Sequence, residues 1–151
     1  MAKYTPPEQS KIGQLIDGCY RRIDYLKETV RLGAGLDSRG LLTEEATQRG
    51  LICLARFAQR LKGFAPGQVR AVATQTLREA KNRKVFLDKA HRILGFPIEV
   101  VSGREEARLI YQGVTRLLPP SQDKRLIIDI GGRSTECVLG QGVHAKVLES
   151  Y

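Results

Sequence analysis

Residues suited to phosphate chemistry gather around one expected turn, within the stretch Leu126–Gly140. Leu126–Ile130 is apolar and rich in β-branched residues, which is typical of a buried strand. Cys137–Leu139 predicts a return strand, so the whole unit should be a β-hairpin. Gly131 and Gly132 lie at its turn, where they can take a positive φ and let the backbone come close to another group.

Acidic and hydroxyl residues flank this Gly-Gly turn. A tight turn can direct several backbone N–H groups at an anion, and the hydroxyls of Ser134 and Thr135 lie beside it. Asp129 before the turn and Glu136 after it could hold a hydrated Mg²⁺ against that anion. The spacing also fits an ordinary hairpin in which both carboxylates are surface charges. A phosphate and magnesium site and a plain hairpin therefore both remain open.

Two adjacent glutamates begin the helix expected over Gly103–Gln112. Ser102 and Glu105 form an S-x-x-E capping box, which gives Glu105 a structural role. Glu106 has no such role, and it follows a strand directly, at the sheet edge where α/β proteins place ligands. It is either a site residue or simply a favourable charge near a helix N-terminus.

Arg78 is the corresponding basic candidate. It follows the strand expected over Gln68–Ala73, and would share a sheet edge with Glu106 and the Gly-Gly turn if the strands are parallel. A guanidinium can pair with phosphate through two hydrogen bonds, although many helical arginines are simply solvated.

The remaining patterns predict the elements that would position these residues. Met1–Ser10 has few apolar residues and should be a loose lead-in. A hairpin is predicted first, with strands Lys11–Ile16 and Tyr20–Val30 joined by Asp17-Gly18. Helices are predicted from the N-cap Thr43 to about Lys62, at Thr76–Ala80, and at Val85–Leu94 with Gly95 as the stop. Further strands are predicted at Pro97–Val101 and Val143–Leu148. Strands and helices alternate between Gln68 and Ile130, which favours an α/β layer with parallel strands and flanking antiparallel hairpins.

Composition narrows the class of protein. The chain has 151 residues, 42% of them hydrophobic and 27% charged, as in one ordinary globular domain. Its net charge of +9 favours a polyanionic partner: nucleic acid, polyphosphate or a phosphorylated nucleotide. Nucleic acid has only this charge in its favour, because no RNA-recognition, zinc-finger or helix-turn-helix signature is present. Three scattered cysteines without metal-ligand spacing and the lack of a long apolar run predict a cytoplasmic protein that does not enter a membrane.

Four stretches resemble, in the same order, motifs of the exopolyphosphatase and guanosine-pentaphosphatase family, which belongs to the actin, sugar-kinase and heat-shock ATPase superfamily. These stretches are Arg31–Leu36, Ala73–Ala80, Val100–Gly113 and Asp129–Glu136. The resemblance runs from about Lys11 to the end of the chain. It implies an α/β fold of the ribonuclease-H-like, actin-like ATPase type, with a mixed sheet and flanking helices. Residues 11–151 would then form part of the family's N-terminal domain.

The resemblance also implies a reaction and roles for the candidate residues. The reaction would be hydrolysis of terminal phosphoanhydride bonds in inorganic polyphosphate or guanosine pentaphosphate. Glu106 matches the family's general base, which activates water. Phosphate would be bound by Arg78, Gly131, Gly132, Ser134 and Thr135. Mg²⁺ would be held by Asp129 and Glu136.

The chain departs from the family pattern in two respects. Arg133 stands where the family usually has Gly or Ala, and its side chain could crowd the phosphate or add a cationic contact. The family's first phosphate loop is not present in Met1–Ser10, and the family continues into a second lobe beyond the position of Tyr151. We therefore expect one incomplete lobe that is inactive or weakly active by itself and that self-associates, for example as a homodimer. The alternative is a non-catalytic member of the family that binds polyphosphate or another polyanion or has a regulatory role.

Overall fold

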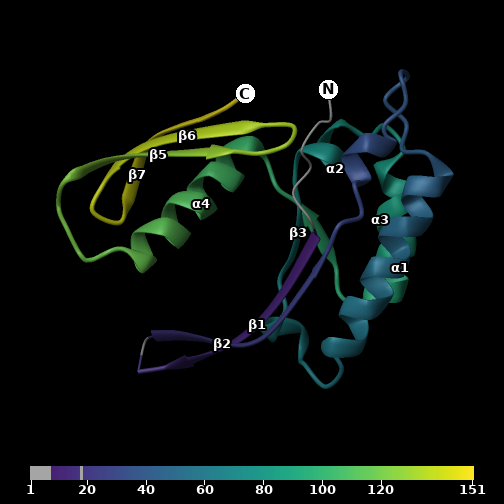
Figure 1. Ribbon diagram of the computed structural model, residues 1–151, viewed down its shortest axis with the longest axis horizontal. Coiled ribbons are helices and arrows are strands. Elements are labelled where there is room, and N and C mark those ends of the chain that lie inside the picture. The colour runs from purple at the N-terminus through teal and green to yellow at the C-terminus, as the bar shows by residue number, and fades with distance from the viewer. Residues whose placement is uncertain (1–7, 18) are drawn as a thin grey trace. The chain divides into compact units, whose positions relative to one another are not determined.

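The computed structural model describes residues 8–17 and 19–151 and has the mixed α/β composition predicted from the sequence (Figure 1). The chain forms two compact units. The C-terminal unit contains residues 72–79 and 99–151, and the N-terminal unit contains the other described residues. All the candidate site residues belong to the C-terminal unit, so their mutual geometry is that of one compact body.

An antiparallel hairpin begins the N-terminal unit. It consists of β1 (Glu8–Ile16) and β2 (Cys19–Glu28), which confirms the predicted pair of strands, while Gly18 of the predicted turn lies outside the described residues. The strand starts earlier than predicted, because Glu8 already pairs with Glu28 and its carboxylate accepts a hydrogen bond from the backbone N–H of Val30 at 2.9 Å. The end of the predicted lead-in is therefore part of the sheet.

Helices make up the rest of the N-terminal unit. They are the 3₁₀ helices η1 (Leu32–Gly35) and η2 (Pro66–Gln68) and the α-helices α1 (Glu44–Arg60) and α3 (Arg83–Leu94). The two predicted helix ends are confirmed: the hydroxyl of Thr43 accepts from the backbone N–H of Ala46 at 3.3 Å, and Gly95 ends α3 with a φ of 80°. The core of this unit forms around the buried residues Val30, Cys53, Phe57 and Leu94.

The C-terminal unit combines short strands, helices and a three-stranded sheet. Its elements are β3 (Ala71–Ala73), α2 (Gln75–Glu79), β4 (Ile98–Val100), α4 (Gly103–Leu117), β5 (Lys124–Ile130), β6 (Thr135–Gln141) and β7 (His144–Ser150). The first residues of β3 and β4, Ala71 and Ile98, are assigned to the N-terminal unit. Strand β3 is shorter than predicted because Pro66–Gln68 forms η2 instead. Helix α4 is longer than predicted because Tyr111 and Thr115 are buried, so packing continues along its length.

The described strands form three small sheets. β1 pairs with β2, β3 pairs with β4, and β5–β6–β7 is an antiparallel meander. We expected one α/β layer between the hairpins, and the layer consists of only the β3–β4 pair among the residues described. Helix α4 packs against β6 and β7 through a core of Ala107, Tyr111 and Val138.

No helix in the described part of the chain has both the length and the apolarity needed to cross a membrane.

Gly140 is a site where the packing of α4 on the meander can be tested. A Cβ atom at this position would overlap the ring and hydroxyl of Tyr111, which is fully buried and donates a hydrogen bond to the carbonyl of Gly142 at 3.1 Å. We expect Gly140→Ala to lower the free energy of unfolding by about 1–3 kcal/mol, the usual cost of overpacking a core. Urea denaturation of the two proteins measures this difference.

Gly113 provides the matched control, because a Cβ atom on this residue of α4 meets no atom within 4 Å. Gly113→Ala should stabilise the helix by about 0.5–1 kcal/mol, since alanine loses less backbone entropy. Equal effects of the two substitutions would contradict the packing described here.

Candidate functional site

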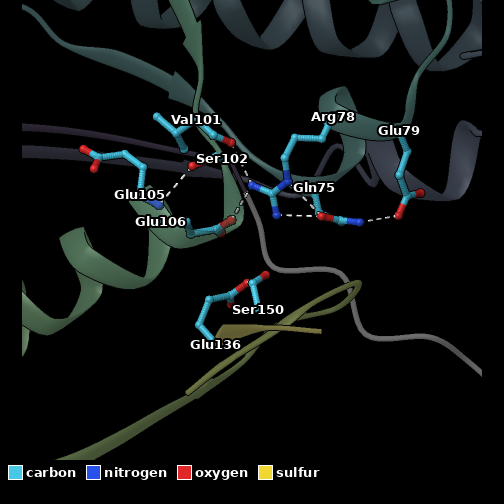
Figure 2. Close-up of polar contacts among 9 residues, drawn as sticks. All are labelled: Gln75, Arg78, Glu79, Val101, Ser102, Glu105, Glu106, Glu136 and Ser150. Carbon is cyan, nitrogen blue, oxygen red and sulfur yellow. Dashed lines mark hydrogen bonds and ion pairs between the residues drawn. The ribbon is translucent and has the colours of Figure 1, made fainter. Parts of the chain in front are cut away.

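Arg78 and Glu106, both predicted as site residues, are in direct contact. Nη1 of Arg78 donates to Oε2 of Glu106 at 2.7 Å, and each side chain is only 17% exposed (Figure 2). Arg78 lies on α2 after β3, and Glu106 lies in the first turn of α4 after β4. The two residues thus lie at one edge of the β3–β4 pair, as expected from the sequence, and their direct contact is an addition to that expectation.

Two further acceptors fix the plane of the Arg78 guanidinium. Nη1 also donates to the carbonyl oxygen of Val101 at 2.9 Å. Nε and Nη2 both donate to Oε1 of Gln75, at 2.9 and 2.6 Å, as Figure 2 shows. The neighbouring Leu77 is buried and anchors the short helix α2. Arg78 is thus held on several sides rather than projecting freely from a helix.

The environment of Glu106 favours a proton-accepting role. Burial raises the pKa of Glu106, the hydrogen bond from Arg78 opposes this rise, and the negative charges of Glu136 and Asp129 add to it, so the pKa lies above its ordinary value. A carboxylate whose pKa has moved toward neutrality is a stronger base than an ordinary surface glutamate. Arg78 binds Oε2, so Oε1 is the oxygen through which Glu106 can accept a further proton.

Glu105, the adjacent carboxylate, points away from Arg78 (Figure 2). Its backbone N–H donates to the hydroxyl of Ser102 at 3.2 Å, which confirms Ser102 as the N-cap of α4. Its carboxylate accepts two hydrogen bonds from Arg108, each 2.7 Å long. The cap by Ser102 is therefore as predicted, whereas the Glu105 carboxylate, expected to complete the capping box, pairs with Arg108.

Asp129 and Glu136 are direct partners across the β5–β6 pair. Residues in this relation place their side chains on the same face of a sheet. Glu136 is 1% exposed and accepts a hydrogen bond from the hydroxyl of Ser150 at 2.9 Å, whereas Asp129 is exposed. The alternative of a plain hairpin in which both carboxylates are surface charges is therefore wrong for Glu136.

The close approach of β7 to the start of α4 helps to place the buried carboxylate. A Cβ atom on Gly103 would lie 2.5 Å from the hydroxyl oxygen of Ser150, which holds Glu136. Gly103 therefore allows the strand that carries Ser150 to lie against the first turn of α4. The same turn carries Glu106, which explains why Glu106 feels the charge of Glu136.

The surroundings of Asp129 and Glu136 fit a hydrated Mg²⁺ ion. Neither residue takes part in an ion pair with any residue that the structure describes. The described part of the chain contains no group of three or more His, Cys, Asp or Glu residues placed to hold a metal ion. An all-protein metal cage is thus not formed here, but Mg²⁺ commonly uses one or two carboxylates together with water and substrate phosphates.

The Gly-Gly turn differs from the prediction in its backbone. The N–H of Gly131 donates to the carbonyl of Ser134 at 2.9 Å, so this donor is used inside the turn. Gly131 and Gly132 are not among the described glycines with positive φ. Glycine is favoured at residue 131 by space, since a Cβ atom would lie 3.1 Å from the Ser134 carbonyl oxygen. Thr135 exchanges two backbone hydrogen bonds with Tyr151, at 2.9 and 3.0 Å, which ties the end of the turn to the strand beside it.

Arg133, whose role the sequence left open, forms an ion pair with Glu79 of α2. Burial acts to raise the pKa of Glu79, but hydrogen bonds from Gln75 and Arg133 outweigh this effect and hold the pKa below its ordinary value. Arg133 therefore has a protein partner, which neither of the two sequence-based alternatives anticipated.

Sequence reasoning missed Gln75, Glu79 and Ser150. The first two are four residues apart on α2, and their hydrogen bond of 2.6 Å has the common i,i+4 spacing. This spacing is visible in the sequence but is too common to indicate a site. Ser150 has no sequence signal, because its proximity to Glu136 depends on the pairing of β6 with β7.

The site thus combines a guanidinium held against the partly buried Glu106 with the carboxylate pair Asp129 and Glu136, and these are residue types that can bind phosphate and its metal ion. The model of the Ppx/GppA phosphatase family matches residues 13–151, and the chain belongs to this family.

Known proteins resemble the chain in sequence and in structure. It is 50% identical over 135 residues to the guanosine-5'-triphosphate,3'-diphosphate pyrophosphatase of Vibrio vulnificus, a match covering 89% of this chain and 27% of that protein. An exopolyphosphatase from Cytophaga hutchinsonii superposes with a TM-score of 0.88 at 30% identity, over 97% of this chain and 47% of that one. The PPX-GPPA enzyme of Aquifex aeolicus gives a TM-score of 0.85 at 29% identity, over 97% and 48%.

These similarities confirm the family and the actin-like ATPase fold that the sequence predicted. They also show that the chain spans about a quarter of the length of the curated relative and about half of each solved structure.

Proposed function

We propose that this chain supplies the base and phosphate-binding residues for hydrolysis of terminal phosphoanhydride bonds, with guanosine pentaphosphate or inorganic polyphosphate as the substrate. The contact between Arg78 and Glu106 carries the proposal, because it joins a phosphate-binding cation to a carboxylate of raised pKa. The relative that is 50% identical is named for a guanosine nucleotide, and a solved neighbour of 30% identity is an exopolyphosphatase. The higher identity favours the nucleotide.

The reaction would begin with a water molecule hydrogen-bonded to Oε1 of Glu106. As the water oxygen attacks the terminal phosphorus, Glu106 takes its proton, and the bond from phosphorus to the bridging oxygen breaks. The products are inorganic phosphate and a chain or nucleotide shorter by one phosphate. Arg78 stays against Glu106, and its positive charge offsets the negative charge of the phosphoryl oxygens.

The Gly-Gly turn and the paired carboxylates would complete the site. Gly132, Ser134 and Thr135 would bind phosphate oxygens directly. Gly131, whose N–H group is used inside the turn, would contribute by allowing the tight turn that presents them. Asp129 and Glu136 would hold Mg²⁺, which neutralises charge on the transferring phosphoryl group when it is bound.

The role of Glu106 is tested by Glu106→Gln, which keeps the shape but cannot take a proton. The assay uses a chimera of the Vibrio vulnificus relative in which this chain replaces the matching 135 residues. We expect phosphate release from guanosine pentaphosphate to fall about 10²–10⁴-fold with little change in substrate binding. Because the base must be ionised, activity should decline as the pH falls through the pKa of Glu106, which burial raises above its ordinary value.

Glu105→Gln is the matched control for this experiment, since Glu105 is the adjacent residue and pairs with Arg108. It should leave the rate nearly unchanged. A severe loss in Glu105→Gln together with a mild one in Glu106→Gln would show that the base has been assigned to the wrong carboxylate.

Mg²⁺ dependence tests the paired carboxylates. Mg²⁺ should tighten the binding of polyphosphate to the chain, because the buried Glu136 and the exposed Asp129 form a hard oxygen site. The double substitution Asp129→Asn with Glu136→Gln should remove this dependence, as measured by calorimetric titration. Asp123→Asn is the control, since Asp123 lies beyond the other end of β5. Equal polyphosphate affinity of the unsubstituted chain in Mg²⁺ and in excess chelator would refute the metal role.

A further inference from the structure

A series of polar contacts connects the Gly-Gly turn with Arg78. Arg133 of the turn forms an ion pair with Oε2 of Glu79. Oε1 of Glu79 accepts from Nε2 of Gln75 at 2.6 Å, and Oε1 of Gln75 accepts two hydrogen bonds from Arg78. All four residues lie in the C-terminal unit. Figure 2 shows the contacts of this series that run from Glu79 through Gln75 to Arg78.

The donors and acceptors of these four side chains give the series of hydrogen bonds a fixed direction. An ionised carboxylate only accepts hydrogen bonds, so Glu79 selects the amide orientation in which the NH₂ group of Gln75 faces it. The amide oxygen of Gln75 must then face Arg78, a residue that only donates. A rotated amide would place two acceptors together on one side and two donors together on the other.

Arg133 keeps Glu79 in the orientation that this selection requires. Its guanidinium binds one carboxylate oxygen, and the other oxygen remains directed at Gln75. The ion pair and the hydrogen bond from Gln75 also favour the ionised form of Glu79, since both lower its pKa. A glycine at residue 133 would leave Glu79 without this cation.

We propose that Gln75 and Glu79 are positioning residues which, anchored by Arg133, hold the guanidinium of Arg78 in place against Glu106. Arg133 then acts through Glu79 and Gln75 rather than as a direct phosphate ligand. The importance of this arrangement for catalysis rests on the proposed function, whereas the hydrogen-bond chain can be tested by itself.

The test observes the Arg78 Nε–H group directly in the ¹⁵N-labelled chain, by the rate at which its proton exchanges with water. Gln75→Leu removes the acceptor of this proton, and Glu79→Gln keeps the shape of residue 79 but removes its charge. We expect both substitutions to speed exchange at Arg78 about three- to tenfold, the effect of losing a hydrogen bond worth about 0.5–1.5 kcal/mol. Arg133→Leu should act in the same direction, and Arg133→Lys should restore most of the protection because it keeps the cation beside Glu79.

Gln48→Leu is the matched control. Gln48 donates to Glu44 at 2.7 Å with the same i,i+4 spacing, but it lies on α1 in the other unit. It should leave exchange at Arg78 unchanged. Unaltered exchange at Arg78 in both Gln75→Leu and Glu79→Gln would overturn the proposal, and so would an equal acceleration by Gln48→Leu.

A binding measurement on the same variants separates this proposal from the proposed function. Gln75→Leu should weaken the affinity for inorganic tripolyphosphate by a similar factor of about three to ten, and Gln48→Leu should not. If the unsubstituted chain binds no tripolyphosphate, the proposed function fails, while the exchange rates still decide whether Gln75 and Glu79 position Arg78. Faster exchange in Gln75→Leu without any loss of affinity would overturn the positioning role.

Discussion

The contact between Arg78 and Glu106 balances opposing electrostatic effects. Burial and the nearby Glu136 and Asp129 favour the protonated form of Glu106, and the guanidinium favours the ionised form. Three acidic residues thus share a region with one closely bound cation. Such a region should attract further positive charge, which supports the proposed metal ion beside the carboxylates and the proposed role of Glu106 as a base.

Short connections between neighbouring elements of the fold position the groups that surround this contact. Strand β3 leads into α2, β4 leads into α4, and the carbonyl of Val101 at the end of β4 accepts from Arg78. Gly103 lets β7 approach α4, and Ser150 on that strand then holds Glu136. The positions of the acidic groups therefore depend on the packing of α4 against the β5–β6–β7 sheet, which buries Tyr111 completely.

Features set by neighbouring residues could be predicted from the sequence. The caps at Thr43 and Ser102 and the hairpins follow from local patterns. The common sheet edge of Arg78 and Glu106 follows from their positions after two successive strands, but their contact does not. The direction of an individual side chain was harder to predict. The partner of Arg133 could not be predicted from the residues around it, because that partner, Glu79, is 54 residues away in the chain.

The turn at Gly131 shows another limit of sequence reasoning. Glycine indicates either an unusual backbone angle or a close approach, and only the coordinates show that the Ser134 carbonyl is the cause here. The length of β3 was also predicted incorrectly. The strand expected from Gln68 begins only at Ala71, because Gln68 belongs to a 3₁₀ helix.

The measurement that tests the central claim most directly is a map of ¹H–¹⁵N chemical-shift changes in the chain as tripolyphosphate and Mg²⁺ are added. The phosphate site described here predicts the largest changes at the backbone amides of Gly132 to Thr135 and at the Nε–H of Arg78. Changes confined to basic residues elsewhere, such as Lys11, Arg21 and Arg22 of the β1–β2 hairpin, with none at the turn, would contradict the claim. They would show that the chain binds polyanions through its net charge of +9 rather than through a built phosphate site.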